Sequence, residues 1–131
     1  GRLIGGNLTL LTSTLGTPYE IDTSGRLLFL EEVNEPLYAI DRMLTQLHLA
    51  GKLERCAGII FTSCHRCYAD NPQRSLTLEE IFQEQLAPLA IPCFYGLSVG
   101  HVKPNLPLPI GYQATMNATE GRLIFDEPII C

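Results

Sequence analysis

Three short runs of mainly apolar residues constrain the fold of this chain more than any other feature. They occupy residues 26–31, 57–61 and 92–97. Uninterrupted apolar runs of this length are typical of strands that are buried on both faces, as in a parallel sheet. Each run is too short for an ordinary helix, so we interpret each of them as one strand.

Helical patterns separate these runs. A short helix follows Asn7, a residue that caps helices well, and Gly16 is expected to end it. Residues 36–51 repeat leucine and isoleucine at helical spacing and end on a glycine. Thr77 and Glu80 form a capping box, which predicts a third helix that reaches about residue 86.

The alternation of strands and helices indicates right-handed crossovers and a small parallel sheet. The pattern changes after residue 108, because residues 110–116 and 122–125 flank a turn in which Gly121 suits a left-handed backbone. We therefore predict an α/β fold: a small parallel sheet with helices, plus an antiparallel β element at the C-terminal end. The length of 131 residues fits one domain.

Composition excludes several classes of partner. The chain is 46% hydrophobic and 18% charged, which is enough apolar material for one sizeable core. A net charge of −5 argues against nucleic acid and anionic membranes as partners. No apolar run reaches the roughly 18 residues of a membrane span. The five cysteines are an odd number, which favours reduced thiols and a cytoplasmic location. The start at Gly1 is typical of the interior of a longer protein.

Two residues stand where a parallel sheet binds its ligands. Glu31 ends the first predicted strand, and His101 follows the third. The carboxyl ends of parallel strands meet at one edge of the sheet, so these residues can approach each other. A carboxylate that holds a histidine is the orienting part of a nucleophilic triad. On the pattern alone, Glu31 could instead cap or salt-bridge a local group, and His101 could be an ordinary loop histidine.

Four segments of the chain resemble successive blocks of the LD-carboxypeptidase family, in order and over nearly the whole length. They are residues 5–20, 27–53, 91–101 and 106–117. The resemblance implies the C-terminal domain of that family, a swivelling β/β/α-like fold spanning residues 1–131. It places the family's catalytic glutamate on Glu31 and its catalytic histidine on His101. It also suggests that Glu32, Glu35, Asp41 and Arg42 are helix-entry charges and structural pairs.

The resemblance also implies an activity. The family's enzymes are serine carboxypeptidases without a metal or other cofactor, and they cleave the L,D-amide to the terminal D-alanine of murein tetrapeptides during cell-wall recycling. Their serine belongs to an N-terminal domain that has no match here, so this chain alone is expected to be inactive. We also expect a homodimer, since the surface that faces the other domain would be exposed. Two alternatives stay open: a related hydrolase that gives immunity to a peptide–nucleotide antibiotic, and a non-catalytic binding module.

Ser98 lies in a Gly96–Gly100 segment that fits the nucleophile-elbow pattern G-x-S-x-G. Such an elbow needs a helix directly after the serine. Three prolines among residues 102–109 prevent one, so we do not assign Ser98 as the nucleophile.

Other polar motifs carry weaker signals. Cys64 and Cys67 could be half of a zinc site or a redox pair, but we predict an ordinary polar loop over residues 64–75, without a metal. His48 is expected on a helix surface. The glycines before Asn7 lack the remaining residues of a phosphate-binding loop, and we expect them to allow a close approach of another domain or a substrate.

Overall fold

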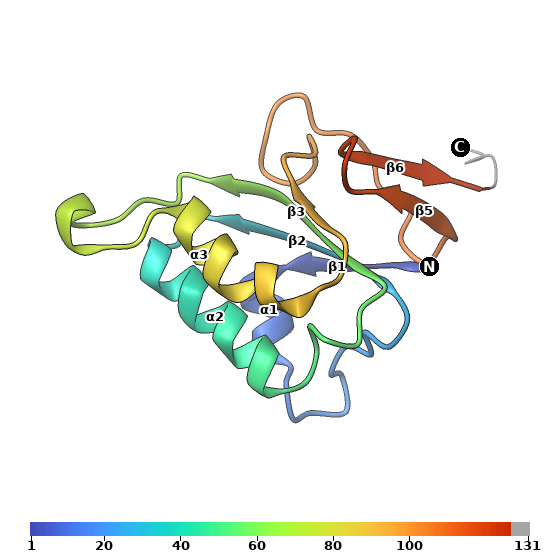
Figure 1. Ribbon diagram of the computed structural model, residues 1–131, viewed down its shortest axis with the longest axis horizontal. Coiled ribbons are helices and arrows are strands. Elements are labelled where there is room, and N and C mark those ends of the chain that lie inside the picture. Colours follow the sequence, from blue (N-terminus) through green and yellow to red (C-terminus); the bar gives the residue numbers. More distant parts are fainter. Residues whose placement is uncertain (127–131) are drawn as a thin grey trace.

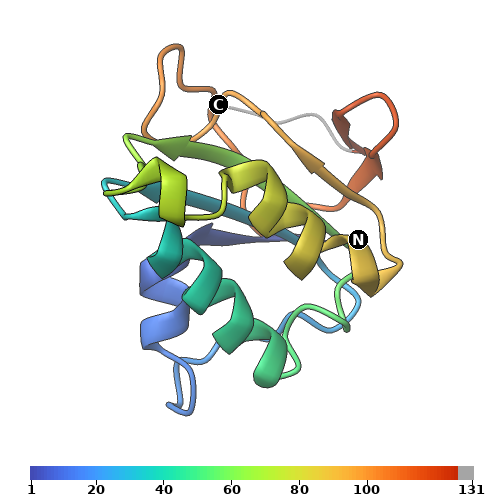
Figure 2. The same ribbon diagram turned by 60° about the vertical axis from the view of Figure 1, so that its left-hand side comes forward.

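The computed structural model describes residues 1–126 and is a sheet covered by helices on one face and by a hairpin on the other (Figures 1 and 2). The sheet has four parallel strands in the order β1-β2-β3-β4. The strands are β1 (Leu3–Asn7), β2 (Leu27–Val33), β3 (Gly58–His65) and β4 (Cys93–Tyr95). The helices are α1 (Leu8–Ser13), α2 (Leu37–Leu49) and α3 (Leu78–Gln85), with short 3-10 turns at Pro72–Arg74 and Ala87–Leu89. The predicted α/β fold is confirmed.

The three predicted strands are β2, β3 and β4, but the sequence did not reveal β1. Gly5 lies in the middle of this strand with a φ of 136°. A Cβ atom at Gly5 would lie 1.9 Å from the carbonyl oxygen of Phe29 on β2. Gly5 therefore allows two neighbouring strands to approach each other, and our expectation that it faces a substrate or another domain was wrong. For Gly6, where a Cβ atom would meet nothing within 4 Å, that expectation stays a prediction.

Helix ends follow the local signals in the sequence. The side chain of Asn7 accepts a hydrogen bond from the backbone N–H of Leu10, although α1 ends at Ser13, before Gly16. Helix α2 ends in a Schellman motif, in which Gly51 adopts a φ of 65°. The capping box of α3 forms as predicted.

Apolar side chains form two cores, one on each face of the sheet. The larger core lies between the sheet and the helices and includes Leu30, Ile40 and Phe61. The smaller core lies beneath the hairpin and includes Phe29 and Ile60. Successive residues of β2 and β3 point to opposite cores, which explains why the apolar runs are uninterrupted.

The antiparallel element is the predicted hairpin of β5 (Ala114–Asn117) and β6 (Arg122–Phe125). Gly121 has a φ of 62° at the end of its turn. Ala114 is fully buried in the smaller core, and Gly1 donates to the carbonyl of Ala114. The hairpin is therefore fastened to the start of the chain. Within residues 1–126, no helix has the length and apolarity needed to cross a membrane.

Candidate active site

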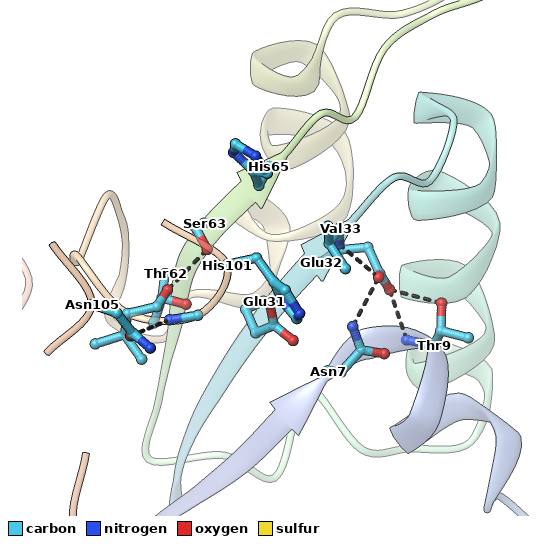
Figure 3. Close-up of polar contacts among 12 residues, drawn as sticks. Asn7, Thr9, Glu31, Glu32, Val33, Thr62, Ser63, His65, His101 and Asn105 are labelled. Atoms are coloured by element: carbon cyan, nitrogen blue, oxygen red, sulfur yellow. Dashed lines mark hydrogen bonds and ion pairs between the residues drawn. The ribbon is translucent and has the colours of Figure 1, made fainter. Parts of the chain in front are cut away.

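Glu31 and His101 meet at the carboxyl end of the parallel sheet. Glu31 lies near the end of β2, and His101 lies in the long loop between β4 and β5. The Nδ1 atom of His101 is 2.8 Å from Oε2 of Glu31, although the residues are 70 positions apart (Figure 3). The glutamate side chain is only 9% exposed, whereas the histidine side chain is 57% exposed.

This geometry determines which ring nitrogen of His101 carries the proton and which one is free to accept one. A carboxylate that accepts from Nδ1–H leaves the lone pair of the neutral ring on Nε2 and stabilises the ring when Nε2 takes a proton. Within residues 1–126, Nε2 has no hydrogen-bond partner, and Glu31 bonds to no side chain except His101. Within the described part of the chain, Glu31 therefore caps no local group.

The neighbouring carboxylate serves another purpose. Glu32 points to the opposite face of β2 and is 2% exposed. Its oxygens accept four hydrogen bonds, from the Asn7 amide, from the N–H and hydroxyl of Thr9, and from the N–H of Val33 (Figure 3). Glu32 thus places negative charge at the N-terminus of α1, where it is favourable.

Among the other charged residues for which structural pairs were expected, Asp41 does form one. Its carboxylate accepts a hydrogen bond from the amide of Gln85, which joins α2 to α3. Glu35 and Arg42 instead line a small polar hollow beside α1. No ion pair within residues 1–126 involves either of them, so the structural pairing expected for these two charges is not found.

Ser98 does not sit on a nucleophile elbow. It is exposed in the loop after β4, and the next regular element within residues 1–126 is the strand β5. The predicted absence of a helix after Ser98 is confirmed. The serine therefore lacks the helix N-terminus that an elbow places beneath its nucleophile.

The cysteine motif only partly lies in a loop, because Cys64 belongs to β3 and only Cys67 follows the strand. Burial raises the pKa of both thiols above the ordinary value, which opposes a thiolate and therefore a redox role. No group of three or more potential metal ligands occurs within residues 1–126. His48 lies exposed on α2, with Nδ1 3.2 Å from Oε1 of Glu54, as expected for a surface residue.

The fold and the site together define a class: an α/β domain that holds a histidine–carboxylate pair at the carboxyl ends of its parallel strands. The comparison with protein families then identifies the family within this class. The family model of the LD-carboxypeptidase C-terminal domain matches residues 1–116, and the chain belongs to this family.

Individual relatives agree with that assignment. The probable murein peptide carboxypeptidase of Bacillus subtilis is 45% identical over 96% of this chain and 40% of its own length. The crystal structure of muramoyltetrapeptide carboxypeptidase from Oxalobacter formigenes superposes with a TM-score of 0.85 at 32% identity, over 98% of this chain and 46% of that chain. The microcin C7 self-immunity protein MccF of Escherichia coli is 29% identical over 89% of this chain and 34% of its own length. The chain thus spans less than half of each of these relatives.

Proposed function

We propose that this chain supplies the histidine and the glutamate of a Ser-Glu-His triad in a serine-type LD-carboxypeptidase. The hydrogen bond between His101 Nδ1 and Glu31 Oε2 is the observation that carries the proposal. A separate N-terminal domain supplies the serine and the oxyanion hole. It approaches the carboxyl ends of the strands, where the half-exposed ring of His101 faces outward.

The chemistry follows from this arrangement. Nε2 of His101 takes the hydroxyl proton while the serine oxygen attacks the carbonyl carbon of the amide. The same nitrogen gives that proton to the leaving amine, and the acyl-enzyme forms. Water then repeats the sequence and releases the shortened peptide. Glu31 fixes the tautomer and stabilises the imidazolium in both steps without itself taking the proton.

The substrate we propose is the L,D-amide to the terminal D-alanine of a murein tetrapeptide, with cell-wall recycling in the cytoplasm as the setting. The names of the Bacillus subtilis and Oxalobacter formigenes relatives support this substrate class. The free thiols of Cys56, Cys64, Cys67 and Cys93 fit a reducing compartment. We propose that the enzyme works as a homodimer.

The test joins this chain to the N-terminal domain of a family member and measures release of D-alanine from an L,D-tetrapeptide. The chain alone should release none, because its histidine has no serine to activate. In the joined enzyme, Glu31→Gln should lower kcat by about 10⁴-fold and His101→Ala by at least that factor. The surface variant His48→Ala is the matched control and should keep full activity. Full activity in His101→Ala or Glu31→Gln would refute the proposal.

A second substrate class follows from the similarity to MccF, a microcin C7 self-immunity protein. The same triad would hydrolyse an amide or acyl-sulfamoyl bond in a peptide–nucleotide antibiotic. Turnover of both substrates by the same joined enzyme separates the two possibilities. Hydrolysis of neither would indicate a non-catalytic binding module.

A further inference from the structure

The Val99–Gly100 peptide unit lies one residue before His101, and both of its polar atoms are held by side chains. The hydroxyl of Ser63 donates to the carbonyl oxygen of Val99 at 2.9 Å. The backbone N–H of Gly100 donates to Oδ1 of Asn105 at 3.0 Å. The carbonyl and the N–H belong to the same planar peptide bond. Two side chains therefore fix the orientation of this peptide plane, which lies one peptide unit before His101 (Figure 3).

An irregularity of the sheet brings Ser63 to this place. Leu30 of β2 pairs with Phe61 of β3, but Glu31 pairs with Ser63, so Thr62 is an extra residue. Paired residues of parallel strands point to the same face, and one extra residue reverses the face of those that follow. Without this bulge Ser63 would point toward the helices. With it, Ser63 lies on the same face as Glu31, beneath the loop that carries His101.

The loop rests directly on these two side chains. A Cβ atom at Gly100 would lie 2.9 Å from Oε2 of Glu31 and 2.9 Å from Oγ of Ser63. Gly100 also has a φ of 101°, which side-chain-bearing residues rarely adopt. The absence of a side chain at Gly100 thus lets the backbone descend far enough for the next residue to reach Glu31.

We propose that Ser63 and Asn105 are positioning residues of the active site. They hold the Val99–Gly100 peptide so that the exposed ring of His101 meets the carboxylate. The alternative is that Ser63, which is 5% exposed, only satisfies a buried carbonyl and contributes to stability. The kinetic part of this inference rests on the proposed function, whereas the structural part does not.

The structural part is tested on this chain by NMR of the proton that His101 Nδ1 shares with Glu31, at neutral pH and low temperature. Wild type should show this proton as a sharp downfield signal. Ser63→Ala and Asn105→Ala should broaden it into the solvent line, because the ring samples other positions. Asn105→Asp keeps an acceptor for the Gly100 N–H and should restore the signal.

A control separates positioning from stability. Thr23 is buried like Ser63 and its hydroxyl donates to the carbonyl of Lys52, away from the loop. Thr23→Val should lower stability as Ser63→Ala does, and it should leave the His101 signal unchanged. In the enzyme joined to its N-terminal domain, Ser63→Ala and Asn105→Ala should lower kcat by about 10²-fold with little change in KM. Thr23→Val should keep the wild-type kcat.

A sharp His101 signal in both alanine variants would overturn the inference, and so would an unchanged kcat in an enzyme that cleaves its substrate. If Ser63→Ala fails to fold, the NMR signal and the kcat of Asn105→Ala alone test the inference. The Asn105 side chain is exposed, so its removal leaves the core intact. If the wild-type joined enzyme cleaves nothing, the proposed function fails. The NMR comparison still decides whether Ser63 and Asn105 hold the histidine.

Discussion

Replacing Glu32 by glutamine separates the roles of the two adjacent glutamates. Oε1 of Glu32 accepts from the Asn7 amide and the Val33 N–H, and Oε2 accepts from the N–H and the hydroxyl of Thr9. Glutamine has only one acceptor oxygen. In either orientation its NH2 group faces a backbone N–H, of Thr9 or of Val33, which then loses its acceptor.

The expected loss of stability follows from these contacts. One buried N–H without an acceptor costs about 1–3 kcal/mol. The negative charge at the N-terminus of α1 contributes about 0.3–1 kcal/mol more. We therefore expect Glu32→Gln to lower the free energy of unfolding by about 3 kcal/mol. With a urea dependence of about 2 kcal/mol per molar, the unfolding midpoint should fall by about 1.5 M.

Urea unfolding followed by circular dichroism measures this midpoint, and Glu31→Gln is the matched control. Glutamine at position 31 keeps an oxygen for the single bond to a half-exposed histidine, so the loss should stay below about 1 kcal/mol. The reasoning is refuted if Glu32→Gln unfolds within about 0.3 M of wild type. It is equally refuted if Glu31→Gln is the less stable variant.

Three further predictions concern the fold. Gly5→Ala should destabilise the chain by at least about 3 kcal/mol, since its Cβ would overlap the Phe29 carbonyl; a cooperative unfolding curve at the wild-type midpoint would contradict the close approach of β1 and β2. Thr77→Ala removes the hydroxyl that accepts from the Glu80 N–H and should cost about 1 kcal/mol, whereas Thr77→Ser should keep the cap, as thermal unfolding of both variants would reveal. Burial raises the pKa of Cys56 from 9.0 to about 11, so the unfolded thiol ionises first and stability should fall as pH rises from about 9 to 11. Cys56→Ala should remove this part of the pH dependence, and a pH profile identical to wild type would refute its origin.

The fold was largely predictable because apolar runs and helix caps are local signals. The strand β1 was not, because glycines occupy two of its five positions and show no periodic pattern. The second half of β3 was also missed. Its residues Thr62 to His65 are polar or mixed, and their place in the sheet depends on pairing with β2 rather than on their own composition.

The residues of the candidate site also fall into those that the sequence revealed and those that it did not. Glu31 and His101 were identified because strand ends are visible in a sequence and because the blocks around them resemble a family. Ser63 and Asn105 were not identified, since their positions depend on a bulge and on the closure of a loop, which leave no periodic trace. The polar pair Thr62–Ser63, which directly follows an apolar run, was the one local signal that could have drawn attention to this strand end.

The placement of Glu31 and Glu32 on opposite faces of one strand also predicts how this pair should vary among related sequences. A replacement at position 32 removes hydrogen bonds that hold the start of α1, so it should be accompanied by changes at Asn7 or Thr9. A replacement at position 31 should be accompanied by a change at His101. An alignment shifted by a single residue would exchange these two patterns of covariation and move the proposed catalytic role from Glu31 to Glu32, whose carboxylate binds the N-terminus of α1.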